Sequence, residues 1–450
     1  MTATRAGLLD PLFGTEAMRE VFSDASLLQG MLDFEAALAS AEARCGVIPA
    51  QAAGIITRVC GDARLNTEAL GRAAVSAGNL AIPLVRELTA LVAQEDGNAS
   101  GWVHWGATSQ DAIDTGLVLQ LRRALALLED DLVRLIRAQA ALVRKERGTV
   151  MTGRTWLQQA LPITFGLKVA GWLDGNLRHL ERIKAARSGL AVQFGGAVGT
   201  LASLGSDGLA VRGALAEALQ LNVPDLPWHS QRDRLVEIAC GVGMLVGALG
   251  KTARDMALLM QTELGEASEP AAPGRGGSST MPHKRNPVAA APILAAALRV
   301  PGLVATLLSA MVQEHERGLG GWHAEWEVLP EIFRLAAGAL SQSAAVAEAL
   351  SVDRKAMAAN LERSQGVLMA EAVTMALGRF VGRGTAHALL EKAAHEATTS
   401  GQPLRTFLEA DSTVSQYLTP KDLEHLLDPS NYLGSTQQFV DAVLTRADRI

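Results

Sequence analysis

The chain has 450 residues, a formal net charge of -6 and a hydrophobic fraction of 48%. This length leaves room for two or three domains with a substantial buried interior, and an aromatic content of only 4% beside abundant Ala and Leu favours helices over strands. The weak negative charge provides no overall field that would attract nucleic acid or an acidic membrane surface, so an anionic ligand must be held by a local basic cluster.

Apolar periodicity predicts helices along most of the chain. Helical stretches over 25–44 and 66–94 indicate a smaller N-terminal domain. From 114 to about 145, apolar residues recur at alternating steps of three and four, the pattern of one long amphipathic helix. A second run over 232–264 repeats this pattern and would be about 50 Å long at ~1.5 Å per residue. Helices of this length are longer than a small domain is wide.

Part of the second run, IACGVGMLVGALG over 238–250, carries no charge on any face. Such a helix must be buried all round, and Gly243 and Gly247 allow close helix contact. It is either a buried helix within one chain or a helix at the centre of a bundle of several chains. We favour the second alternative, because the helices of one chain can surround only part of so long a rod.

These patterns predict an all-α chain of three domains. The N-terminal helical domain covers 1–112, and a central long-helix bundle covers 113–358. Shorter helical segments and turn-rich stretches follow, which indicate a C-terminal helical domain over 359–450.

The most unusual segment is GRGGSSTMPHKRNP, over 274–287, which resembles neither a helix nor a strand. Its glycines allow the backbone to move and to expose N–H groups, and Lys284 and Arg285 add positive charge. The segment therefore has the composition of a mobile anion-binding lid. The alternative is a solvated loop between helices, but a position between two buried helices weakens it.

The part GSSTMPHKRNP resembles the signature of the fumarase/aspartase superfamily, which has the form Gly-Ser-Ser, any residue, Met-Pro, any, Lys, any, Asn-Pro. Other segments that resemble this superfamily are WVHWGATSQDAIDT (102–115), GRTWLQQALPITFGLK (153–168), QRDR (231–234) and QEHERG (313–318). The resemblance covers nearly the whole chain. It implies a three-domain fold whose central bundles form the core of a homotetramer, with each active site built from three subunits.

The resemblance also implies roles for individual residues. Ser278 would exchange a proton with a substrate carbon, while Lys284 and Asn286 would hold the carboxylate beside that carbon. Thr108 and Ser109 would bind a carboxylate. Adding a nucleophile across a double bond next to a carboxylate builds charge on that carboxylate, and cations aimed at it lower the barrier. Serine is a poor acid or base at its free pKa, so Ser278 needs the electropositive loop; a backbone cap is its alternative role.

Further residues would line the substrate site by the same resemblance: His104, Thr155, Trp156, Gln158, Ser279, Met281 and Arg317. His104 is equally consistent with a structural histidine. Arg317 would pair a substrate carboxylate or, alternatively, form a buried salt bridge with Glu316 or Asp233. The histidines lack metal-ligand spacing, so we expect neither a metal nor another cofactor.

Trp156 separates two reactions within the branch that holds adenylosuccinate lyase and the carboxymuconate cycloisomerases, which the chain resembles most. The lyases have His at this position, which helps to protonate the departing group. A lactone-forming enzyme needs no such acid, because its nucleophile is a substrate carboxylate with a pKa of about 4. Trp156 would then form an apolar wall for a flat diene, the alternative being simple helix packing.

Two other departures favour the cycloisomerases. Where nucleotide-handling lyases have an Arg-Tyr pair and a serine-rich stretch for phosphate, this chain has Leu12-Phe13 and GLGGWHAEW (318–326). The stretches AGNLAIPLV (77–85) and GGWHAEWEVLPE (320–331) also resemble carboxymuconate cycloisomerases.

The resemblance thus implies an intramolecular lyase that lactonises a small tricarboxylate, 3-carboxy-cis,cis-muconate, in the β-ketoadipate pathway of aromatic catabolism. One alternative is an adenylosuccinate lyase-like enzyme that eliminates fumarate from a succinyl substrate. The other is a catalytically silent structural protein, because fold alone does not determine function.

The three cysteines, Cys45, Cys60 and Cys240, are odd in number, which argues against a secreted disulfide framework. The sequence shows no signal-peptide pattern and no run of the roughly 18 to 20 apolar residues that a membrane helix needs. We therefore expect a cytoplasmic protein with no membrane or nucleic-acid partner.

Overall fold

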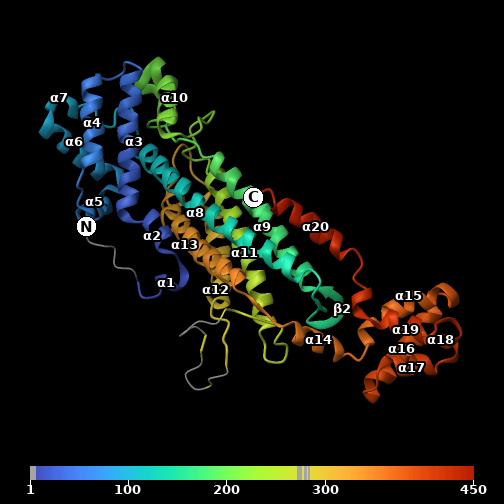
Figure 1. The fold of residues 1–450 in the computed structure, drawn as a ribbon. Coiled ribbons are helices and arrows are strands. Elements are labelled where there is room, and N and C mark those ends of the chain that lie inside the picture. Colours follow the sequence, from blue (N-terminus) through green and yellow to red (C-terminus); the bar gives the residue numbers. More distant parts are fainter. Residues whose placement is uncertain (1–6, 271–275, 278–280, 282–283) are drawn as a thin grey trace. The chain divides into compact units, whose positions relative to one another are not determined.

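The computed structural model describes all residues except 1–6, 271–275, 278–280 and 282–283. The described chain is mostly helical, as the composition predicts (Figure 1). The elements up to residue 188 are α1 Asp10–Phe13, α2 Glu16–Val21, α3 Asp24–Arg44, α4 Ala50–Asp62, α5 Thr67–Ala77, α6 Ala81–Glu95, α7 Gly97–Ser100, α8 Ser109–Glu146, β1 Val150–Thr155, β2 Gln158–Thr164 and α9 Phe165–Ser188.

The elements that follow complete the central part and the C-terminal part of the chain. The central ones are α10 Gly208–Leu219, α11 Asp233–Leu259, β3 Ala267–Ser268, α12 Ala290–Ala310 and α13 Gly321–Glu348. The C-terminal ones are β4 Ser351–Val352, α14 Arg354–Glu362, α15 Ala370–Val381, α16 Arg383–Ser400, α17 Leu404–Ala410, α18 Ser412–Tyr417, α19 Pro420–Leu427 and α20 Thr436–Ala447.

Contacts divide the chain into two compact units, each made of three segments. The first unit consists of Met1–Asp131, His179–Gly247 and Ala295–Ser341. One core cluster of this unit is formed by buried apolar residues of α3, α4 and α6 with the start of α8 and with α10. The second unit consists of Leu132–Arg178, Ala248–Leu294 and Gln342–Ile450, and it contains a separate core cluster made by α15 to α19.

The long helices confirm the predicted periodicity, and their ends have local causes. The predicted helix over 114–145 is α8. The predicted run over 232–264 is α11, which ends at Leu259; a turn follows in which Gly265 has a left-handed φ of +60° and Glu266 N donates to the carbonyl of Leu259 at 3.0 Å. The predicted stretch over 66–94 is two helices, α5 and α6, because Gly78 ends α5 in the left-handed region with its N–H bonded to the carbonyl of Ala74.

The uncharged stretch over 238–250 is not buried all round within one chain. Gly243 provides the predicted close approach, since a Cβ there would lie only 3.0 Å from Val304 Cγ2 of α12. Met244 is nevertheless 50% exposed, and no atom lies within 4 Å of a Cβ placed on Gly247. By length and composition alone, α11 and α12 would be long and apolar enough to cross a membrane, a property that helices at the centre of a bundle share.

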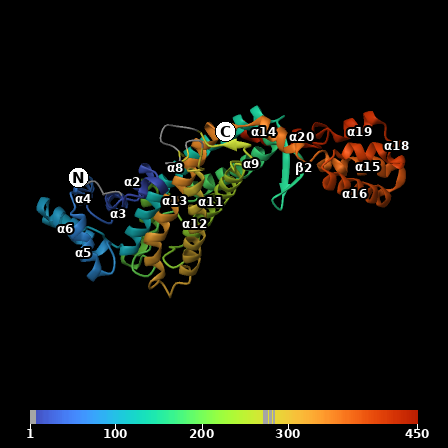
Figure 2. The ribbon, with the colours of Figure 1, turned by 90° about the horizontal axis from the view of Figure 1, so that it is seen from below.

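Apolar periodicity did not predict the hairpin of β1 and β2. The two strands pair antiparallel, with Thr155 opposite Gln158, and the register shifts between Thr152 and Arg154. The two residues of the turn, Trp156 and Leu157, both have left-handed φ values, +53° and +66°, which is typical of a tight two-residue hairpin turn. Figure 2 shows the hairpin projecting from the helices of its own unit.

Candidate active site

The predicted site residues fall into two groups, one in each unit. The first unit contains His104, Thr108, Ser109 and Arg317. The second unit contains Thr155, Trp156, Gln158, Met281, Lys284 and Asn286. Ser278 and Ser279 lie outside the described residues.

In the first unit, Arg317 lies beside the start of α8. Its Nη1 donates to Thr108 Oγ1 at 3.0 Å, and its Nη2 donates to the carbonyl of Ala197 at 2.9 Å. In the described part of the chain it has no carboxylate partner, so the alternative of a salt bridge with Glu316 or Asp233 is wrong. Its charge remains available to an anion. Because Thr108 Oγ1 accepts from Arg317, the Thr108 hydroxyl hydrogen is left to donate to that anion as well.

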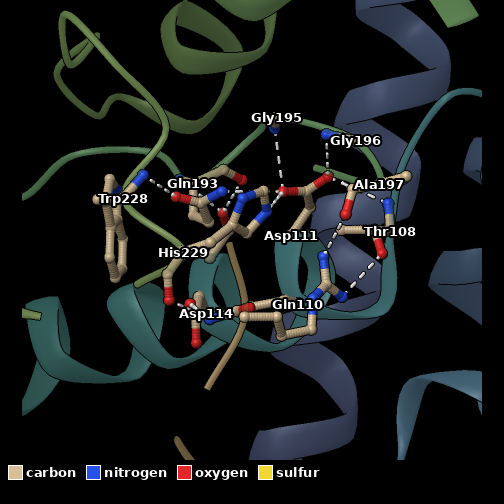
Figure 3. A network of polar contacts seen from close by, with 12 residues as sticks. Thr108, Gln110, Asp111, Asp114, Gln193, Gly195, Gly196, Ala197, Trp228 and His229 are labelled. Carbon is tan, nitrogen blue, oxygen red and sulfur yellow. Dashed lines mark hydrogen bonds and ion pairs between the residues drawn. The ribbon is translucent and has the colours of Figure 1, made fainter. Parts of the chain in front are cut away.

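A buried carboxylate is bonded to the backbone at both Thr108 and Gly196 (Figure 3). Asp111 is fully buried, and its two oxygens accept five hydrogen bonds. Oδ1 accepts from Gln193 Nε2 at 3.0 Å, Gly195 N at 3.0 Å and His229 Nε2 at 2.9 Å, and Oδ2 accepts from Gly196 N at 2.9 Å and Thr108 N at 3.1 Å. The same carboxylate thus joins the start of α8 to the turn at 195–197.

That turn requires glycine. A Cβ on Gly195 would lie 2.6 Å from Pro227 Cβ, which leaves no room for a side chain. Gly196 has a φ of +68°, and a Cβ there would lie 3.0 Å from the carbonyl oxygen of Gly106. The two backbone segments, 104–109 and 195–197, therefore lie directly against each other.

A buried carboxylate, that of Glu35, also holds the side chain of His104 in place. Its backbone is left-handed, with φ +59°, and its Nδ1 donates to Glu35 Oε1 at 2.6 Å. Glu35 is only 1% exposed. Burial lowers the pKa of His104, but the charge and hydrogen bond of Glu35, with a smaller contribution from Asp111, outweigh burial and leave the pKa raised. A raised pKa favours the imidazolium, which would attract a carboxylate.

A second acid lies on the same helix as Glu35. Glu42 is fully buried, and neither of its carboxyl oxygens has a partner among the described residues. Burial, assisted by the negative charge of Glu35, raises the pKa of Glu42 to about 9. Glu42 is therefore neutral at pH 7.

The QRDR segment supports the start of α8 differently. Arg232 is completely buried and donates from Nη1 to Asp114 Oδ2 at 2.6 Å and from Nη2 to Glu325 Oε2 at 2.5 Å. Trp322 Nε1 donates to Asp114 Oδ1 at 2.9 Å. This network ties the start of α11 and α13 to α8, and Arg232, Asp114 and Glu325 make no direct bond to Thr108, Arg317 or residues 195–197.

In the second unit, the tip of the β1–β2 hairpin is open. Trp156 is 97% exposed and Leu157 is 75% exposed, so Trp156 does not pack between helices of its own chain. The base of the hairpin is fixed, because Arg154 forms an ion pair with buried Glu266 at 2.6 Å. Gln159 Nε2 also donates to the carbonyl of Asn360 at 3.0 Å.

The described part of the signature segment is held at its base. Asn286 N donates to Gly276 O at 2.9 Å, and Lys284 N donates to Met281 O at 3.0 Å. Glu269 joins the two sides of the segment, since its carboxylate accepts from the first N–H groups of α12 and its carbonyl accepts from Arg285 Nη2 at 3.0 Å. Within the described ranges, no cluster of three or more potential metal ligands occurs.

Residues 13–302 match the model of a family described as lyase, and residues 366–443 match the adenylosuccinate lyase C-terminus. The chain is 54% identical to the 3-carboxy-cis,cis-muconate cycloisomerase of Pseudomonas aeruginosa, over 97% of this chain and 95% of that protein. It is 50% identical to the enzyme of the same name from Bradyrhizobium diazoefficiens over the full length of both.

A solved structure is also similar. The crystal structure of 3-carboxy-cis,cis-muconate lactonizing enzyme from Pseudomonas putida superimposes with a TM-score of 0.92 at 50% identity. The match covers 98% of this chain and 99% of that one. Sequence and fold therefore agree over nearly the whole length.

Proposed function

The chain belongs to the lyase family of the fumarase/aspartase superfamily, and from this premise we propose how it closes 3-carboxy-cis,cis-muconate into a lactone. It is an intramolecular lyase, an isomerase that converts this tricarboxylate to carboxymuconolactone in aromatic catabolism. The observation that carries the assignment is the near full-length identity of 50% or more to two cycloisomerases.

The reaction forms one C–O bond and one C–H bond. An oxygen of a substrate carboxylate attacks one carbon of a double bond, and the neighbouring carbon, which is next to another carboxylate, takes up a proton. Ser278 supplies that proton in our proposal. Lys284 and Asn286 hold the carboxylate on which charge builds up, and they act most strongly in the transition state.

The group in the first unit binds a second carboxylate. Arg317 and the Thr108 hydroxyl are 3.0 Å apart and both have capacity to donate to an anion. Ser109 follows at the first position of α8, where the helix dipole also favours negative charge. His104, held as an imidazolium by Glu35, adds a further positive charge.

The hairpin and the signature segment carry the other residues that the family resemblance assigns to a substrate site. Trp156 stacks on the flat diene, and Thr155 and Gln158 flank it at the turn. Ser279 and Met281 line the site from the signature segment. The substrate carboxylate is the nucleophile when the ring closes and the leaving group when it opens. Because this group is a stable anion at neutral pH, the reaction needs no general acid at position 156, and an apolar ring there does not impair it.

We also propose a cytoplasmic homotetramer in which three subunits contribute to each site. Only 28% of the most apolar 18-residue stretch of α12 is buried within the chain, and Leu298 on this helix is 81% exposed. The side chain of Trp156 is likewise exposed in its own chain, which supports its burial against another subunit. All three cysteines are free thiols, which suits a reducing compartment.

The direct test is to follow the ultraviolet absorbance of the carboxymuconate diene with the full-length enzyme. We expect the diene absorbance to disappear with lactone formation, and no fumarate release from adenylosuccinate or argininosuccinate. Ser278→Ala should lower turnover by a factor on the order of 10² to 10⁴ while substrate still binds. Fumarate release without loss of the diene would contradict the proposal and favour the lyase alternative.

A further inference from the structure

Asp111 is not among the residues proposed above to bind substrate. It nevertheless bonds to the backbone of Thr108 and of Gly196, the residue before Ala197, and Thr108 and Ala197 are the two residues that hold Arg317. We infer that Asp111 is a positioning residue, whose carboxylate sets the distance between Thr108 and the turn at 195–197 and thereby orients Arg317 toward the substrate. This inference rests on the proposed function, in which Thr108 and Arg317 bind a substrate carboxylate.

The contacts form a closed ring. Oδ2 of Asp111 accepts from both Thr108 N and Gly196 N, so a single oxygen joins the two backbone segments. On the other side, Arg317 joins the same two segments through Thr108 Oγ1 and the carbonyl of Ala197. Figure 3 shows the Asp111 carboxylate bonded to the backbone of Thr108, Gly195 and Gly196. Each anchor of Arg317 is thus adjacent in sequence to, or the same as, a residue held by Asp111.

A carboxylate side chain suits this place, because every group that faces its oxygens is a donor. Five N–H donors converge on its two oxygens inside a fully buried region, and a carboxylate offers acceptor positions without any donor of its own. In an Asn side chain of the same shape, an NH₂ group would replace one oxygen and would face at least two N–H donors. The segments would have to move apart, because buried donors that face each other are costly.

Asp114, one turn further along α8, is a matched control. It is also fully buried and accepts four hydrogen bonds, but its partners are Arg232, Trp322 and Gln110. A purely structural role predicts similar consequences for the two substitutions. A positioning role predicts that only the substitution of Asp111 alters the binding of substrate.

The experiment compares Asp111→Asn and Asp114→Asn in the full-length enzyme with carboxymuconate as substrate. We expect Asp111→Asn to raise KM by roughly 10- to 100-fold, in line with one or two hydrogen bonds to a charged group, with a smaller fall in kcat. Asp114→Asn should lower the melting temperature while KM stays within about threefold of wild type. Equal KM increases in both variants would overturn the inference.

A double-mutant cycle with Thr108→Val tests whether Asp111 acts through Thr108. If it does, the double variant should be little worse than the poorer single variant, whereas independent roles would multiply the two KM effects. Multiplying effects would overturn the inference while leaving the function intact. A wild-type enzyme that does not consume carboxymuconate would instead refute the proposed function.

If Asp111→Asn does not fold, Gly196→Ala provides the same test without altering the carboxylate. Its Cβ would press on the carbonyl of Gly106 and displace the turn from Thr108. We expect a KM increase of at least about fivefold, because the left-handed φ and the 3.0 Å contact both oppose alanine. A wild-type KM in this variant would contradict the positioning role.

Discussion

The start of α8 and the tip of the β1–β2 hairpin both carry predicted site residues, and both contain left-handed residues other than glycine. At the start of α8, His104 is held by Glu35, and Thr108 is held by Asp111 and Arg317. At the hairpin tip, Trp156 and Leu157 lie almost entirely in solvent. The first region is supported by its own chain, and the second is supported only at its base.

This comparison distinguishes the site residues that one chain holds in place from those that it leaves exposed. A strained backbone persists only where neighbouring groups hold it in place. Before α8, Glu35, Asp111 and Arg317 provide these contacts. A large apolar ring with 97% exposure lacks them. In the tetramer proposed above, another subunit would cover the hairpin tip.

The largest effect should come from breaking the buried network behind α8. Replacing Arg232 by Met leaves Asp114 and Glu325 as buried charges without their cation, which should cost about 3–5 kcal/mol in the free energy of unfolding. Urea denaturation at fixed subunit concentration measures this. Trp156→Ser is the control at the exposed tip, and we expect it to leave the subunit's unfolding unchanged. A stability loss in the Trp156 variant that matches Arg232→Met would remove the contrast between the regions.

An intermediate effect should appear in the pH profile when Glu35 is replaced by Gln. The ion pair raises the pKa of His104, so its stabilisation is fully present below the ordinary histidine pKa of about 6.5 and is lost as the pH rises through the raised value. Glu35→Gln should shift the alkaline rise in KM to lower pH, because it removes the charge that raises the pKa of His104.

Glu42→Gln is the matched control for Glu35→Gln. The two acids lie on the same helix, but Glu42 has a pKa of about 9 and carries no charge at pH 7. The KM profile of Glu42→Gln should follow that of the wild type up to neutral pH. Identical profiles for Glu35→Gln and the wild type would show that the imidazolium has no part in binding.

The smallest effect concerns the exposed ring itself. Trp156→Phe should retain more activity on carboxymuconate than Trp156→His, because Phe keeps a flat apolar face of the kind that contributes roughly 0.5–1.5 kcal/mol in aromatic pairs. The added imidazole should bring no benefit, since the leaving group is a carboxylate. Steady-state kcat/KM of both variants decides the order. A His variant that equals the wild type while Phe is inactive would indicate a polar role at 156.

The long helices were predictable because their apolar periodicity is local. The same holds for the signature segment, whose residues are contiguous. The hairpin was not predictable in this way, since its tip exposes Trp156 and Leu157 instead of burying them.

The supporting residues of the site were missed for a different reason. Glu35 is 69 residues from His104, and Asp111 is 84 and 118 residues from Gly195 and His229. Such partners leave no short-range pattern. The available signals were an acid within the apolar helix over 25–44 and the paired glycines at 195–196, which require a close contact but do not identify its partner.

Mixing two inactive variants tests most directly whether segments from different subunits build one site. Arg317→Met and Lys284→Met each remove one proposed substrate cation, from the first and the second unit respectively. If the two segments of a site come from different subunits, co-refolded equal mixtures should regain about a quarter of the wild-type activity, because random assembly leaves that share of sites with both segments intact. Light scattering should show tetramers in the same samples. Mixtures that form tetramers but remain as inactive as the two parents would contradict the account, because both cations would then belong to one chain's own site.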